Sequence, residues 1–171
     1  MKKEKDPPKH LWAPWRMSYI TGIDTKKDEG CIFCSKPRQD RSRDKDNLLL
    51  YRGKTCFVLM NLFPYNNGHL MVIPYKHTSD ILDIDSETSA ELWGLICGSK
   101  RALDSVMHPD GFNIGMNVGR TAGAGIDQHI HIHIVPRWNG DTNFMPVVGE
   151  TKVISQALSD TYDALSPHFS S

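Results

Sequence analysis

Polar and hydrophobic residues alternate along the run 129–135, where histidine occupies every second position up to residue 133. Side chains of a β-strand point alternately to its two faces, so this run predicts a strand with a period of two. His129, His131 and His133 should share one face of that strand. The isoleucines between them should face the opposite way, into a hydrophobic core.

Shorter apolar runs over 55–60, 69–73 and 112–118 predict three further strands. The turn sequence over 64–68, with its proline, asparagines and glycine, should join the first two of these strands as a hairpin with a long loop.

Two segments have a helical spacing of apolar residues instead. The first should begin at Ser86, with Ser86 as its N-cap, and run to about Met107. The second covers 151–165 and should be stopped by Pro167. The highly charged segment 35–47 predicts a solvated loop.

Together these elements predict an α+β fold with a mainly antiparallel sheet, one long inserted helix and a C-terminal helix. A single domain should cover 11–171, preceded by a disordered tail over 1–10. Within the domain we expect an aromatic arm over 11–29, a core over about 30–145, and the C-terminal helix.

The composition is that of an ordinary globular protein, with 39% hydrophobic and 23% charged residues in a chain of 171. The 20 basic and 20 acidic residues cancel, which argues against nucleic acid as a partner. No apolar stretch reaches the roughly 20 residues of a membrane span. The first residues lack the apolar run of a signal peptide, so we expect a cytoplasmic protein without a membrane partner.

Three imidazoles on one strand face indicate chemistry, because imidazole can act as a nucleophile, titrates near neutral pH and binds metals. A neutral imidazole can attack phosphorus and leave again, which divides one difficult displacement into two easier ones. His131 is best placed for this, since a histidine lies on each side of it along the face. The glycine-rich segment 119–125 precedes the strand, and backbone amides in such segments can hold phosphate.

A second candidate site is the pair Cys31 and Cys34, whose C-x-x-C spacing is that of a zinc knuckle. A structural zinc needs four ligands, and this pair supplies two of them. A redox function is less favoured, because no thioredoxin-like βαβ pattern surrounds the cysteines. The alternative is a pair of buried thiols without metal.

The pattern His-φ-His-φ-His-φ-φ resembles the signature of the histidine-triad (HIT) superfamily, in which φ is hydrophobic. The resemblance extends from about Gly30 to Trp138. The segment 136–141, Pro-Arg-Trp-Asn-Gly-Asp, and the segment 11–16, Leu-Trp-Ala-Pro-Trp-Arg, are similar to the Fhit and diadenosine-tetraphosphate phosphorylase branch. The resemblance implies a homodimer that cleaves nucleotides at the α-phosphate.

The resemblance also implies roles for individual residues. His131 would be the nucleophile, His133 would donate to the leaving oxygen, and His129 would orient His131 or bind metal. A structural zinc would be held by Cys31, Cys34, His77 and His129, without an organic cofactor. Candidate contacts to the nucleotide and its phosphates are Asn61, His69, Asn117, Gly123, Gly125, Gln128 and Trp138.

One segment departs from the Fhit pattern, which places Gly-Gln-Thr or Gly-Gln-Ser ahead of the triad. This chain has Ala124-Gly125-Ile126 instead, which leaves room for inorganic phosphate as the acceptor. We therefore expect an enzyme that cleaves dinucleoside polyphosphates, such as diadenosine tetraphosphate, through a nucleotidyl-histidine, by phosphorolysis or hydrolysis. The alternatives are a Hint-like nucleoside phosphoramidate hydrolase and a nucleotide-binding module without significant turnover.

Overall fold

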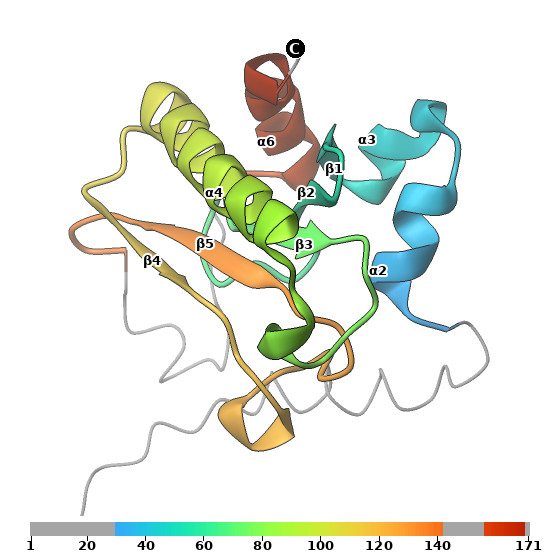
Figure 1. The fold of residues 1–171 in the computed structure, drawn as a ribbon. Helices are drawn as coiled ribbons and strands as arrows, with labels where there is room; N and C mark the ends of the chain where they lie inside the picture. Colours follow the sequence, from blue (N-terminus) through green and yellow to red (C-terminus); the bar gives the residue numbers. More distant parts are fainter. Residues whose placement is uncertain (1–29, 142–155, 170–171) are drawn as a thin grey trace, which may run out of the picture.

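The computed structural model describes residues 30–141 and 156–169. Its centre is a five-stranded antiparallel sheet with the strand order β1-β2-β3-β5-β4 (Figure 1). The strands are β1 Leu49–Arg52, β2 Cys56–Met60, β3 Leu70–Pro74, β4 Gly111–Gly115 and β5 Ile132–Arg137. The α+β class with a mainly antiparallel sheet is confirmed.

One face of the sheet is covered by the long helix α4, Ser86–Met107, and by α6, Leu158–Leu165 (Figure 1). The inward residues of the strands pack here against Leu92, Ile96 and Leu103 of α4. The N-cap of α4 is Asp85, whose side chain accepts from the Thr88 amide at 2.7 Å, so the helix begins at Ser86 but is not capped by it. Two single 3₁₀ turns flank these helices, η3 Ile81–Asp83 and η5 Ser166–Phe169.

The opposite face of the sheet carries a second apolar cluster, built from alternate residues of β2 and β3 and from Phe33. Phe33 lies on the single-turn helix α2, Ile32–Ser35. Alternate residues of each central strand therefore pack into two different cores, because both faces of the sheet are covered.

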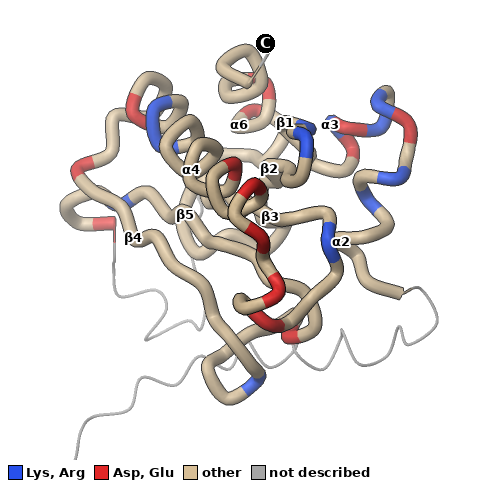
Figure 2. The backbone as a smooth tube through the Cα atoms, in the orientation of Figure 1, with Lys and Arg blue, Asp and Glu red and all other residues tan. Residues whose placement is uncertain are grey.

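The segment expected to be a solvated loop over 35–47 instead forms three short helical turns. They are η1 Lys36–Arg38, η2 Arg41–Arg43 and α3 Asp44–Asn47, and basic and acidic residues are interspersed along this segment (Figure 2). Arg52 ties these turns to β1, because its guanidinium bonds Asp44 and the carbonyl oxygens of Pro37 and Gln39. These contacts come from distant residues, and the local charge pattern did not reveal them.

β2 and β3 lie within one residue of their expected bounds, whereas β4 ends three residues before its expected end, β5 begins three residues after its expected start, and β1 was not expected. β5 begins at Ile132, and the preceding Ile130 amide donates to the Thr78 carbonyl at 2.8 Å, outside the strand ladder. The C-terminal helix begins at Leu158 within the described residues, and residues 151–155 of the expected helix lie outside them. The expected tail and aromatic arm, residues 1–29, also lie outside. Among the described helices, none combines the length and apolar character needed to cross a membrane.

Candidate functional site

The histidine face lies on the side of the sheet opposite α4. Ile130, Ile132 and Ile134 belong to the α4-covered core, which confirms the expected alternation. His129 and His131 point to the other side and are buried, with 1% and 6% exposure. His133 faces the same way and pairs across the sheet with Met71 of β3.

The ring of His131 is held in one tautomer. Its Nδ1 lies 2.8 Å from the carbonyl oxygen of His129, and because a carbonyl only accepts, Nδ1 carries the hydrogen. Nε2 of the neutral ring then has a lone pair, as a nucleophile requires. Burial lowers the pKa of His131, against a smaller opposing effect of that bond, and keeps the ring neutral.

A chain of hydrogen bonds sets the tautomer of His133. The Tyr65 amide donates to Nδ1 of His69 at 3.1 Å, so the hydrogen of His69 lies on Nε2. His69 Nε2 is 2.9 Å from His133 Nδ1 and donates to it. A neutral His133 therefore carries its hydrogen on Nε2, where it can serve as a donor.

His69 itself is a buried neutral base. It is 1% exposed, and burial lowers its pKa to about 3, with the neighbouring His133 and His131 contributing. The side-chain nitrogen of Asn61 lies 3.4 Å from His69 Nδ1, while the Asn61 oxygen accepts from the Phe63 amide. The structure thus brings Asn61 and His69 together with the triad, while their contact with a nucleotide stays a prediction.

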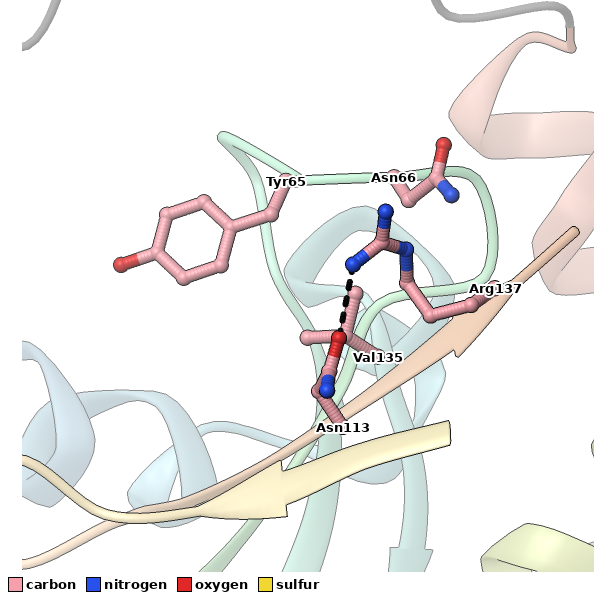
Figure 3. Close-up of a pocket in the computed structure, with 5 residues that line it drawn as sticks. All are labelled: Tyr65, Asn66, Asn113, Val135 and Arg137. Atoms are coloured by element: carbon pink, nitrogen blue, oxygen red, sulfur yellow. Dashed lines mark hydrogen bonds between the residues drawn. The ribbon is translucent and has the colours of Figure 1, made fainter. Parts of the chain in front are cut away.

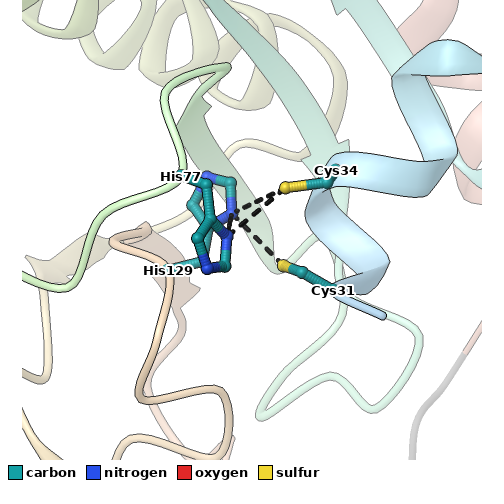
Figure 4. A group of neighbouring side chains, drawn as sticks. All are labelled: Cys31, Cys34, His77 and His129. Atoms are coloured by element: carbon teal, nitrogen blue, oxygen red, sulfur yellow. Dashed lines mark hydrogen bonds between the residues drawn. The ribbon is translucent and has the colours of Figure 1, made fainter. Parts of the chain in front are cut away.

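Figure 4 shows the second cluster, in which Cys31 and Cys34 of the N-terminal turn face His77 and His129. His129 Nδ1 lies 3.3 Å from Cys31 Sγ and 3.6 Å from Cys34 Sγ. His77 Nδ1 lies 3.4 Å from Cys34 Sγ and 3.3 Å from His129 Nδ1. All four candidate ligand atoms are within 4.8 Å of one another.

The four separations of 3.3–3.6 Å fit a tetrahedral metal site. With metal–sulfur and metal–nitrogen bonds of about 2.3 and 2.0–2.1 Å, the ligand atoms of a tetrahedral zinc lie roughly 3.3–3.8 Å apart. The tautomer of His129 agrees, because its Nε2 donates to the Pro74 carbonyl at 2.9 Å and leaves a lone pair on Nδ1. The same histidine thus offers its ring to the metal and its carbonyl to His131.

The expected phosphate loop leads directly into the histidine run. Gly119 and Gly123 have positive φ angles of 83° and 91° and enclose a single 3₁₀ turn, Arg120–Ala122. The Asn117 side chain contacts the Gly123 carbonyl at 3.5 Å, so it braces this loop from the end of β4. Gly125 is half-buried and Gln128 is exposed, immediately before His129.

A cavity of about 230 Å³ continues the histidine face toward the end of β5. It is lined by Tyr65, Asn66, Asn113, Val135 and Arg137, and Arg137 bonds Asn113 across it (Figure 3). The Tyr65 ring lies 4.7 Å from the ring of His69 and 5.6 Å from that of His133. Tyr65 therefore joins this cavity to the triad.

Trp138 lies apart from that cavity. Its indole Nε1 donates to the Met107 carbonyl at 3.3 Å, at the end of α4. The ring lines a different cavity, of about 680 Å³, between α4, α6 and the loop that follows β5. The side chain of Trp138, a predicted nucleotide contact, thus packs away from the histidines.

Comparison with known proteins identifies the family. Residues 42–140 match the family model described as the HIT domain. The chain belongs to the HIT family. This HIT protein is 39% identical over 163 residues to the AP-4-A phosphorylase of Mycobacterium tuberculosis, which covers 92% of this chain and 83% of that one. It is 28% identical over 109 residues to an adenosine 5'-monophosphoramidase of Schizosaccharomyces pombe, over 64% of this chain and 75% of that one.

Solved structures agree with this assignment. A Zn-bound histidine triad family protein from Mycobacterium smegmatis superposes with a TM-score of 0.64 at 28% identity, over 82% of this chain and 93% of that one. The expected superfamily and fold are therefore confirmed, and the expected enzyme class agrees with the similarity to a phosphorylase.

Sequence reasoning missed three parts of the site. Phe33 packs on the histidines, the Tyr65 amide orients His69, and the Pro74 carbonyl orients His129. The aromatic residue inside the Cys31–Cys34 spacing was a usable signal for the first. The other two act through backbone atoms, which no residue type reveals.

Proposed function

We propose that this HIT protein cleaves dinucleoside polyphosphates at the α-phosphate, with His131 as the nucleophile and inorganic phosphate as the favoured acceptor. The observation that carries the proposal is the pair of opposite tautomers. His131 presents a lone pair on Nε2, and the neighbouring His133 presents an N–H on its own Nε2. The two ring centroids are 4.8 Å apart, so both can reach one phosphoryl group.

In the first step, the lone pair of His131 Nε2 forms a bond to the α-phosphorus of diadenosine tetraphosphate. The bond from that phosphorus to the bridging oxygen breaks, and ATP leaves. His133 donates from Nε2 to the departing oxygen, where negative charge develops. The product on the protein is an adenylyl-histidine.

In the second step, an oxygen of inorganic phosphate attacks the same phosphorus and the phosphorus–nitrogen bond breaks. ADP forms, so the balance is one diadenosine tetraphosphate and one phosphate converted to ADP and ATP. The small residues Ala124 and Gly125, of which glycine has no side chain, support phosphate as the acceptor, as does the 39% identity to an AP-4-A phosphorylase. Attack by water would give AMP and ATP instead.

We also propose that the metal held by Cys31, Cys34, His77 and His129 is a structural zinc. The two thiolates and two imidazoles are ligands that zinc prefers, and they leave no open position for a substrate. A bound zinc would fasten the N-terminal turn to the sheet and fix the His129 ring. The Zn-bound neighbour from Mycobacterium smegmatis supports the proposal.

A homodimer is proposed from the family resemblance. Among the residues that the structure describes, no strand pairs with the outer edge of β4, and Ile114 on β4 is 44% exposed. Val118 after it and Trp93 on α4 are 49% and 66% exposed, and exposed apolar side chains of this size are typical of protein interfaces.

The deciding experiment incubates the purified protein with diadenosine tetraphosphate, with and without inorganic phosphate, and separates the nucleotides by chromatography. We expect ADP and ATP in equal amounts, only when phosphate is present. The variant His131→Asn should abolish turnover while it still binds nucleotide. Phosphate-independent AMP and ATP would make the protein a hydrolase, and turnover of an adenosine phosphoramidate alone would make it a phosphoramidase.

A further inference from the structure

The turn that carries Cys31 and Cys34 has a second attachment to the protein besides its thiols. Within α2, Ile32 is 46% exposed, whereas the next residue, Phe33, is only 2% exposed. Both Cys34 and Ser35 donate backbone N–H groups to the Cys31 carbonyl at 3.0 Å, which closes the turn tightly. The thiols therefore project to one side of the turn while the Phe33 ring projects into the apolar cluster on the sheet.

The Phe33 ring packs against His131, the proposed nucleophile, and against His129, a candidate metal ligand. Its centroid is 5.0 Å from that of His131, at an interplanar angle of 53°. It is 5.6 Å from the centroid of His129, in an edge-to-face arrangement at 88°. Both separations are in the range of favourable aromatic pairs.

His131 is consequently held from three directions. The His129 carbonyl holds Nδ1, the His133 ring stands against it edge-to-face at 81°, and the Phe33 ring occupies a further side. One hydrogen bond leaves an imidazole able to tilt about its own axis, because the terminal torsion of histidine is broad. The Phe33 ring, packed against the imidazole, restricts this rotation and keeps Nε2 of His131 directed at the substrate.

We propose that Phe33 is a positioning residue for His131, and that the metal ligands on either side of it hold Phe33 in place. The inference rests on the proposed function, because the orientation of the His131 ring affects the rate only if His131 is the nucleophile. The Cys31–Cys34 turn then links the metal site to the reaction, because the residue between the two thiols touches the nucleophile. A displacement of about 1 Å at a reacting group can reduce a rate by about 100-fold.

The test compares Phe33→Ala and Phe33→Leu with Ile32→Ala, a control that removes an exposed side chain from the same turn. Each protein is prepared with zinc, and its metal content, kcat and KM for diadenosine tetraphosphate are measured. The imidazole nitrogens of His131 are observed by long-range ¹H–¹⁵N NMR correlation, assigned with His131→Asn. In that spectrum a protonated Nδ1 and a bare Nε2 have distinct shifts.

We expect Phe33→Ala to retain its zinc, to lose about 10- to 100-fold in kcat with little change in KM, and to show a mixed His131 tautomer. Phe33→Leu should recover part of kcat, and Ile32→Ala should match the parent protein. An unchanged kcat and spectrum in Phe33→Ala would overturn the proposal. So would an equal loss in Ile32→Ala, or a loss in the Phe33 variants that excess zinc fully restores.

The NMR measurement separates this proposal from the proposed function. If the parent protein cleaves neither diadenosine tetraphosphate nor a phosphoramidate, the reaction assignment fails. The His131 spectrum then still decides whether Phe33 holds the ring. A parent-like spectrum in Phe33→Ala refutes the positioning role in that case too.

Discussion

The buried neutral His69 should make the free energy of unfolding decrease as the pH falls, and a substitution of His69 should remove this part of the pH dependence. Burial lowers its pKa from 6.5 to about 3, so between these values the unfolded chain binds a proton that the folded protein does not. The stabilising contribution is complete above pH 6.5 and is lost as the pH falls toward 3. Replacement by glutamine, which does not titrate, should abolish this dependence.

The magnitude follows from the two pKa values. Each unit of difference corresponds to about 1.36 kcal/mol. Relative to pH 8, linkage predicts that protonation of His69 in the unfolded chain costs about 2 kcal/mol at pH 5 and about 3 kcal/mol at pH 4. A loss of that size is a large part of the stability of an ordinary domain.

The assay is urea unfolding followed by tryptophan fluorescence at pH 5, 6, 7 and 8, for the parent protein and His69→Gln. At each pH, the free energy of unfolding of the parent is subtracted from that of His69→Gln. This subtraction cancels the pH dependence of titrating groups that both proteins contain, including the candidate metal ligands. His168→Gln is the control, because His168 is exposed on η5. His69→Gln should lose about 2 kcal/mol less than the parent between pH 8 and pH 5. Parallel curves for the two proteins would refute the reasoning.

Three further predictions concern stability and the metal. Glu91→Gln should destabilise the fold by about 1–3 kcal/mol in thermal or urea unfolding, because its carboxylate accepts from three donors of the β1–β2 turn; Glu87→Gln, which breaks an exposed ion pair, should change stability by less than about 1 kcal/mol. Cys34→Ser should lose most of the bound zinc by elemental analysis, whereas Cys97→Ser, outside the cluster, should retain it. Gly68→Ala should destabilise by more than about 1 kcal/mol, because φ is +72° and an added Cβ would lie 2.6 Å from Met107 Sδ; an unchanged melting temperature would contradict both the strain from φ and the cost of moving Met107.

The sequence by itself determined which histidines share a face and which residues enter the core. That information is local, because the period of a strand is set by its own backbone and recurs in consecutive residues. The alternation over 129–135 therefore survives in the structure, even though β5 starts only at Ile132. The long helix was equally visible, because its apolar residues recur at helical spacing over many turns.

The grouping of the four candidate metal ligands needed more than a local pattern. Cys31 and His129 are 98 residues apart, and the sequence suggested their pairing only through the resemblance to a known family. Their convergence depends on the sheet order β1-β2-β3-β5-β4, which places the end of β3 beside the start of the histidine run. Strand order and register are set by the packing of the whole chain, so no short segment contains them.

The tertiary structure alone decided how the histidines are oriented. The tautomers of His69, His129 and His131 depend on the Tyr65 amide and on the carbonyl oxygens of Pro74 and His129. Every residue type other than proline carries the same amide and carbonyl, so the sequence cannot mark which of them serve the site. The same holds for Phe33, whose contact with His131 exists only because the folded N-terminal turn lies across the sheet.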